Sequence, residues 1–143
     1  MNARNTTGSC LCGKVEYEIT GNMGIFQYCH CSRCRKVTGS AHASNLFVTP
    51  DQFSWLKGQS SVVNFLPEET KYFATAFCQK CGSSLPWHSK GSEVIIVPAG
   101  TLDANPGIDP MQNIFCGSKA DWYKAPSELP EYSELPVMNS ARV

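Results

Sequence analysis

The sequence has no long apolar run. No stretch approaches the roughly 18 consecutive apolar residues that a membrane-spanning helix needs. The first residues, MNARNTTGS, are polar and contain no apolar segment of the kind found in signal peptides. We therefore expect a protein that does not enter a membrane and that works in the cytoplasm.

Net charge is also missing. Twelve basic residues balance twelve acidic residues, and charged residues make up only 17% of the 143. Without a basic arm or an excess of one sign, the sequence offers no electrostatic footprint for nucleic acid or for an anionic membrane surface. We expect no nucleic-acid partner and instead a small, neutral one.

Long amphipathic periodicity is absent as well, so long helices are not expected. Short runs rich in β-branched and aromatic residues recur instead. The clearest is KVEYEIT, in which apolar and polar residues alternate as on a half-buried strand. Strands are predicted over residues 14–20, 43–48, 61–66, 71–77 and 93–100.

The pattern predicts an all-β, mainly antiparallel fold with little helix. Turns are expected at Pro50, Gly58, Pro67 and Gly82. The stretch SRCRKVTG predicts a helix of one or two turns, with Ser32 as a candidate N-cap and Gly39 as its end. The length is that of one domain, 1–143, with a core at about 6–124 and an extended tail at 125–143 that lies on the domain.

Cysteine is abundant and grouped. Seven of the eight cysteines fall into C-x-C or C-x-x-C groups, a spacing typical of metal sites in a reducing compartment. We interpret these groups as zinc ligands; the alternative is buried free thiols that pack as small hydrophobic side chains. The grouped residues are Cys10, Cys12, Cys29, Cys31, Cys34, Cys78 and Cys81.

The spacing leaves two partitions of these residues open. In the first, the C-x-x-C pairs 31/34 and 78/81 form a zinc ribbon. In the second, the pairs 10/12 and 78/81 form a closed four-thiolate site, and Cys29, Cys31 and Cys34 form another set. The count matters because structural zinc sites have four protein ligands, whereas catalytic sites have three and an open position.

A zinc ion held by three thiolates would carry a net charge of about −1 and would be a weak Lewis acid. It would acidify water poorly, but it would lower the pKa of an incoming thiol and present it as a nucleophile. The three-cysteine set therefore favours thiol chemistry over hydrolysis. The rival interpretation is that His30, His42, His88 or Cys116 supplies a fourth ligand.

Several neighbours of the cysteines have a simpler explanation. We expect a structural role for His30 and a buried, unligated thiol at Cys116. Core positions are expected for Trp55, Trp87 and Trp122. Solvated surface charges are expected at Arg33, Arg35, Lys36 and Lys119, although together they could bind carboxylates. Candidate donors to a developing alkoxide are Ser32, Ser40, His42 and the backbone amides after Cys34.

Four stretches resemble the glutathione-dependent formaldehyde-activating enzymes, the GFA family, which also contains centromere protein V. They follow in order and cover nearly the whole chain: GSCLCGKVEYEITG (8–21), YCHCSRCRKVTGSAHASNLFV (28–48), FCQKCGSSL (77–85) and IFCGSKADWY (114–123). As a set they are specific, because these cysteine groups rarely occur together in this order by chance.

The resemblance implies a β-tent fold built around two zinc ions per chain. It implies a structural zinc on Cys10, Cys12, Cys78 and Cys81, and a catalytic zinc on Cys29, Cys31 and Cys34. The implied activity is of carbon-sulfur lyase type: condensation of glutathione with formaldehyde to S-(hydroxymethyl)glutathione. The partners would then be a small thiol and an aldehyde.

Two other functions are considered. The chain can be a non-catalytic, zinc-stabilised binding module. A redox pair at Cys31 and Cys34 is disfavoured, because a thioredoxin-like motif belongs to a βαβ pattern that the sequence does not show.

Overall fold

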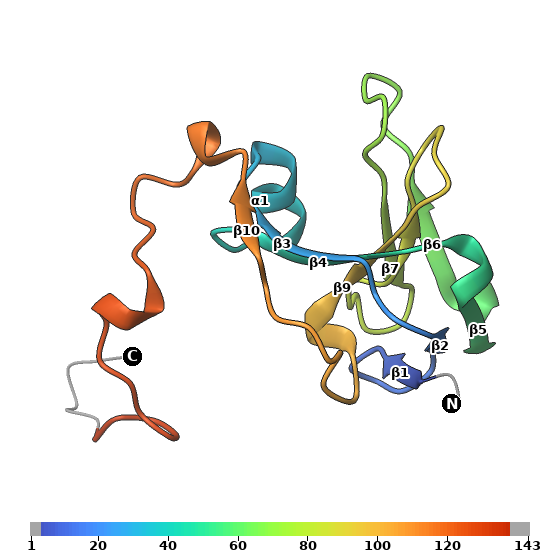
Figure 1. Ribbon diagram of the computed structural model, residues 1–143, viewed down its shortest axis with the longest axis horizontal. Helices are drawn as coiled ribbons and strands as arrows, with labels where there is room; N and C mark the ends of the chain where they lie inside the picture. Colours follow the sequence, from blue (N-terminus) through green and yellow to red (C-terminus); the bar gives the residue numbers. More distant parts are fainter. Residues whose placement is uncertain (1–3, 138–143) are drawn as a thin grey trace.

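Three small β-sheets and one short α-helix make up the computed structural model, which describes residues 4–137 (Figure 1). One sheet is antiparallel and has the order β1-β2-β5. Its strands are β1 Asn5–Ser9, β2 Glu16–Thr20 and β5 Phe53–Lys57. A second antiparallel pair consists of β6 Val62–Phe65 and β7 Thr75–Cys78.

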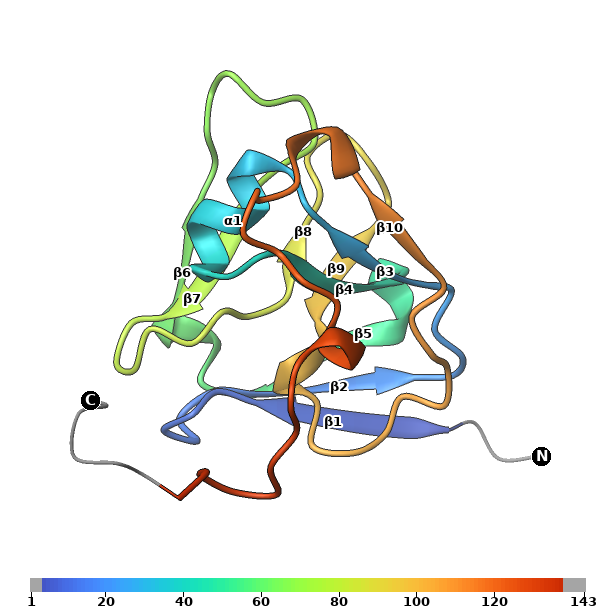
Figure 2. The same cartoon turned by 90° about the vertical axis from the view of Figure 1, so that its left-hand side faces the viewer.

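The five-stranded sheet, with the order β10-β3-β4-β9-β8, lies at the centre of the fold. Its strands are β3 Ile25–Cys29, β4 Ala43–Val48, β8 Trp87–His88, β9 Ile95–Pro98 and β10 Gln112–Ile114. Neighbours are antiparallel except β10, which pairs in parallel with β3. Figures 1 and 2 both show β10 beside β3.

Helix α1, Ser32–Thr38, forms where the sequence predicts it. Its N-cap is Cys31 and not Ser32, because Sγ of Cys31 accepts the backbone N–H of Cys34 at 3.3 Å. A thiolate or thiol thus takes the position usually filled by Ser, Thr, Asp or Asn. Gly39 ends the helix in the left-handed region, at φ 63°.

The remaining helical segments are single 3-10 turns. They cover Pro50–Gln52, Gln59–Ser61, Ala99–Thr101, Cys116–Ser118 and Pro126–Glu128. Among residues 4–137, no helix is long and apolar enough to cross a membrane.

The main core lies between the five-stranded sheet and the sheet that contains β2. Alternation along β2 directs Tyr17 and Ile19 inward, and both are fully buried, as the alternating pattern predicts. Phe26, Leu46 and Val97 meet them from β3, β4 and β9. One face of the five-stranded sheet is therefore used for the core, which leaves the other face for the site described below.

The predicted all-β, mainly antiparallel fold with little helix is confirmed. Strand β4 coincides with the predicted 43–48, whereas the predicted 71–77 is extended only from Thr75. The sequence patterns do not predict β1, β3, β5, β8 or β10. In β1, NTTGS has no apolar residue; in β3, residues on both faces are buried, so apolar and polar residues do not alternate.

The segment predicted as a tail lies partly outside the described residues. From 125 to 137 the chain has one 3-10 turn and mostly exposed side chains, and in Figure 1 it runs away from the sheets. Residues 138–143 are outside the described part.

Candidate functional site

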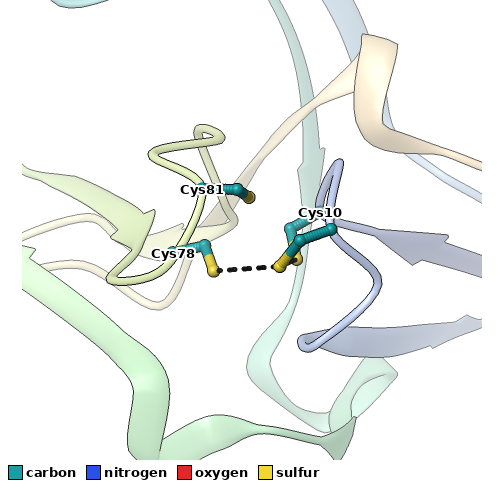
Figure 3. A group of neighbouring side chains, drawn as sticks. Cys10, Cys78 and Cys81 are labelled. Atoms are coloured by element: carbon teal, nitrogen blue, oxygen red, sulfur yellow. Dashed lines mark hydrogen bonds between the residues drawn. The ribbon is translucent and has the colours of Figure 1, made fainter.

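Four cysteines from two turns meet at the ends of β1 and β7. Cys10 directly follows β1, and Cys78 is the last residue of β7. Cys12 and Cys81 lie in the tight turns that follow. Figure 3 shows Cys10 facing Cys78 and Cys81 across the space between the two turns. This grouping is the second of the two partitions that the spacing allows.

The two turns have matching backbone geometry. Gly13 and Gly82 each have a φ of 77°, a conformation that L side chains rarely adopt. Their N–H groups donate to the carbonyl oxygens of Cys10 at 3.0 Å and Cys78 at 2.8 Å. Each turn therefore brings its two cysteine side chains to the same side, as the glycine after the second cysteine predicts for Gly82.

The sulfur positions fit a tetrahedral metal ion. The four Sγ atoms lie within 4.8 Å of one another. Sγ of Cys12 is 3.5 Å from that of Cys10 and 3.9 Å from that of Cys78. Four sulfurs at about 2.3 Å from a tetrahedral zinc would be about 3.8 Å apart. The cluster could therefore hold a metal ion, and four thiolates are a donor set that suits zinc.

This four-cysteine cluster is part of a small second core. Cys10 and Cys78 are buried and pack with Val15, Ala76 and Leu85. The hydroxyl of Ser83, 3.2 Å from Sγ of Cys81, lowers the pKa of Cys81 to about 5. The thiolate, which is the form that binds metals, is thus favoured at neutral pH.

The other three grouped cysteines meet where β3 runs into α1. Cys29 ends β3, Cys31 caps the helix, and Cys34 lies in its first turn. Their Sγ atoms also lie within 4.8 Å of one another. Cys29 and Cys34 are buried, while Cys31 is half-buried. None of the eight cysteines, all of which lie within residues 4–137, forms a disulfide.

Thiol-thiol hydrogen bonding biases the protonation of this three-cysteine cluster. The hydrogen bond from Cys34 lowers the pKa of Cys29 to about 6 and raises the pKa of Cys34. One thiolate is therefore favoured at neutral pH even without a cation. The cluster could hold a metal ion, and its three sulfurs leave one position of a tetrahedron for another ligand.

Within residues 4–137, no fourth His, Cys, Asp or Glu joins the three-cysteine cluster. His30 is fully buried, and its Nε2 is 3.0 Å from Oδ1 of Asn113, in agreement with the expected structural role. Nδ1 of His42 donates to the Ala43 carbonyl oxygen at 3.2 Å. Nε2 of His88 likewise donates to the carbonyl oxygen of Ser92 at 2.9 Å.

Two expectations about neighbouring residues are wrong. Cys116 is exposed and not buried, because it lies in the surface 3-10 turn that follows β10. Trp122 is 66% exposed, whereas Trp55 and Trp87 are half-buried and pack against the core as expected. The sequence pattern gives all three tryptophans the same expectation. In the structure, Trp122 lies outside any strand and is not directed into the core.

A cavity of about 340 Å³ opens at the three-cysteine cluster. Its floor is the face of the five-stranded sheet opposite the main core. Cys29 shares that face with Gln27, two residues earlier on β3, and with Asn45 and Ile96 on the neighbouring strands. Sequence reasoning misses Gln27 and Asn45, since a polar residue in a strand pattern is ordinarily taken to face solvent.

The basic residues near α1 are divided between cavity and surface. Arg33 is exposed and lines the cavity, as does Lys71 from the loop after β6. Nη1 of Arg35 donates to the Ser118 carbonyl oxygen at 3.1 Å. Lys36 is exposed, as expected for a surface charge, and lies outside the cavity lining.

Known proteins resemble this chain in sequence pattern and in fold. The sequence model of the glutathione-dependent formaldehyde-activating enzyme family matches residues 5–118. A search of curated proteins finds no match. A crystal structure of a Rhodobacter sphaeroides protein is similar, with a TM-score of 0.58 and 21% identity, covering 75% of this chain and 98% of that one. At this identity, the likeness concerns the fold alone.

Proposed function

The chain belongs to the glutathione-dependent formaldehyde-activating enzyme family, and from this premise we propose that it is a zinc-dependent enzyme of carbon-sulfur lyase type. The reaction would condense a small thiol such as glutathione with formaldehyde or a related aldehyde. One observation carries the proposal: a three-cysteine cluster lies in the wall of a cavity, while a separate cluster of four cysteines is complete.

The reaction is an addition without redox change. The thiol sulfur forms a bond to the carbonyl carbon, the S–H bond breaks, and the proton ends on the former carbonyl oxygen. The product is a hemithioacetal, which is S-(hydroxymethyl)glutathione when the reactants are glutathione and formaldehyde.

The two clusters are assigned different roles. Cys10, Cys12, Cys78 and Cys81 would hold a structural zinc, because two of the four are buried in the second core. Cys29, Cys31 and Cys34 would hold the catalytic zinc. When bound there, zinc supplies acidification of an incoming thiol, so that a thiolate nucleophile is available at neutral pH.

Besides the cysteines, the cavity contains amide and cationic side chains that can act on the substrates. Oε1 of Gln27 accepts from Nε2 of Gln112 at 2.7 Å, which leaves the Gln27 amide N–H groups as donors on the cavity face. Asn45 offers a second amide beside them. Two such donors near the reacting carbon can stabilise the negative charge that develops on the aldehyde oxygen. Arg33 and Lys71, both exposed, can bind the carboxylates of an anionic thiol.

The test is the rate of adduct formation from glutathione and formaldehyde with the zinc-loaded protein. The wild type should accelerate the reaction beyond its spontaneous rate, measured by NMR of the hydroxymethyl carbon. Cys31→Ser should abolish the acceleration. Cys116→Ser is the matched control, because Cys116 is exposed and does not line the cavity, and it should retain full activity. No acceleration with any small thiol and aldehyde would instead favour a non-catalytic binding module.

A further inference from the structure

The cavity beside Cys29 is large and apolar, and its composition bears on the identity of the aldehyde. We propose, on the basis of the function above, that the preferred aldehyde is not formaldehyde but one that carries an apolar group of about the size of a benzyl group. The anionic part of the thiol would remain at the cavity mouth, and the apolar group would fill the interior.

The floor of the cavity is apolar beyond the two amides. On the face that carries Cys29, Phe47 and Ile96 are direct partners on β4 and β9, and Trp87 is the partner of Ile96 on β8. Successive cross-strand pairs therefore extend an apolar surface away from the cysteines toward the β8 edge of the sheet.

The opposite wall is the loop after β6, which is held in place by polar contacts at its backbone. Phe73 of this loop stands against Trp87, with ring centroids 5.6 Å apart. Nζ of Lys90 donates to the carbonyl oxygens of Pro67 at 2.6 Å and Thr70 at 2.7 Å. The hydroxyl of Ser89 donates to the Tyr72 carbonyl oxygen at 3.1 Å. Figure 2 shows this loop, coloured light green, rising at the same end of the molecule as α1.

The size of the cavity exceeds what formaldehyde needs. Its volume of about 340 Å³ lies within the range of about 300 to 1,000 Å³ of pockets that bury drug-sized ligands. Formaldehyde has two heavy atoms and would leave the faces of Phe47, Phe73 and Trp87 in contact with water. An apolar group that covers those faces removes the free-energy cost of their contact with water.

The distribution of polar groups separates the two reactants. The two cationic residues in the lining, Arg33 and Lys71, are both exposed, whereas Ile96 is buried. The hydroxyls of Thr70 and Ser89 already donate to backbone carbonyl groups of the loop. The amides of Gln27 and Asn45 are assigned to the aldehyde oxygen. A carboxylate of glutathione placed among Phe47, Phe73 and Trp87 would lose its hydration without a cationic partner, so it belongs at the mouth. The interior is then left to the substituent of the aldehyde.

The reaction keeps the same balance with the larger aldehyde. The thiol sulfur bonds to the carbonyl carbon, the thiol proton ends on the oxygen, and the substituent on the carbon takes no part. The product is a hemithioacetal with the apolar group next to the new carbon-sulfur bond.

Two unreactive thioethers test this inference by binding. S-methylglutathione imitates the formaldehyde adduct, and S-benzylglutathione imitates the adduct of benzaldehyde, whose phenyl group is one carbon shorter than the benzyl group of phenylacetaldehyde. In calorimetric titrations of the zinc-loaded protein, the benzyl compound should bind at least about tenfold more tightly, since it buries the additional apolar area. Equal affinities would overturn the inference.

A pair of variants tests whether the difference in affinity between the two thioethers arises from the cavity wall. Phe73→Ala should bring the affinity ratio of the two thioethers to within about threefold, because it removes one apolar wall. Phe65→Ala is the control: Phe65 is 60% exposed on β6 and does not line the cavity, so the ratio should stay unchanged. Zinc content and circular dichroism establish that both variants fold. If Phe73→Ala does not fold, the wild-type ratio alone decides.

Turnover separates this inference from the proposed function. Rates for phenylacetaldehyde and for formaldehyde, each divided by its spontaneous rate with glutathione, should favour phenylacetaldehyde. Acceleration confined to formaldehyde would support the proposed function and overturn the inference. If neither thioether binds but benzyl alcohol does, and Phe73→Ala weakens it, the apolar site stands and glutathione is excluded as the thiol.

Discussion

Gln27 and Asn45 are direct cross-strand partners in the antiparallel pairing of β3 with β4, and both line the cavity that contains Cys29. Each is less than 10% exposed, at 7% and 9%. Oε1 of Gln27 accepts from Gln112, so the two side chains present amide groups to the cavity next to a cysteine cluster. The position suits the oxygen of a carbonyl substrate.

Replacement of the Asn45 amide should slow the chemical step. Asn45→Ala is expected to lower kcat by about 100-fold with a smaller effect on KM, because the donor matters most when negative charge develops on oxygen. Steady-state kinetics with glutathione and an aldehyde measure the split. Asn64→Ala, at an exposed position on β6, should behave as wild type. An unchanged kcat for Asn45→Ala would remove the amide from the proposed mechanism.

The two cysteine clusters should respond differently to loss of one thiol. Cys78 is fully buried in the second core, so Cys78→Ser should abolish the cooperative fold together with the structural zinc. Cys31 is half-buried at the helix start, and Cys31→Ser should leave a folded protein with one zinc per chain. Metal analysis and urea unfolding of both variants check this. Equal unfolding of the two would contradict the division into structural and catalytic sites.

Gly58 should be intolerant of any side chain. It has a φ of 77°, and a Cβ there would stand 2.1 Å from the carbonyl oxygen of Lys14. Gly58→Ala is expected to cost about 3 kcal/mol or more, through both backbone strain and a clash with backbone. Gly91 has a φ of 63° with open space around it, so Gly91→Ala should cost only about 1 to 2 kcal/mol. Similar losses in thermal unfolding would show that the contact with Lys14 relaxes.

Tyr17 should make stability fall in alkaline solution. Burial raises its pKa above the ordinary value near 10, and its hydroxyl is 2.6 Å from Oγ1 of Thr101. Above pH 10 the unfolded chain releases this proton while the folded chain keeps it, so the free energy of unfolding decreases as pH rises.

Tyr17→Phe removes both effects. At pH 8 it should be less stable by about 1 kcal/mol, the value of a hydrogen bond, and above pH 10 its stability should decline less steeply. Urea unfolding at several pH values compares the slopes, with Tyr132→Phe, 61% exposed, as control. Parallel curves for wild type and Tyr17→Phe would mean that Tyr17 titrates normally in the folded protein.

Features that depend on one short stretch of the sequence are predicted well. KVEYEIT, ASNLFV and the short helix ended by Gly39 all depend on neighbours in sequence, and each appears where predicted. The N-cap is less predictable, because a sulfur acceptor at Cys31 departs from the oxygen acceptors that capping rules describe.

The candidate site depends more on tertiary packing. Spacing identifies the cysteine pairs, but it does not show which pairs meet, because β1 and β7 belong to different sheets and share no ladder. The cavity is even harder to predict from the sequence. Whether the face with Gln27 and Asn45 meets solvent or a wall depends on the position of the loop that carries Phe73, which lies far away in sequence.

Cys12 and Cys78 lie 66 positions apart in the sequence and meet in the four-cysteine cluster. In the three-cysteine cluster, by contrast, Cys29, Cys31 and Cys34 belong to one short stretch. A metal held by the first cluster would cross-link the unfolded chain into a long loop and so reduce its conformational entropy, as a disulfide does. A metal held by the second cluster would close almost no loop. The protein could therefore lose and regain the second ion during its working life with little effect on how readily the chain folds.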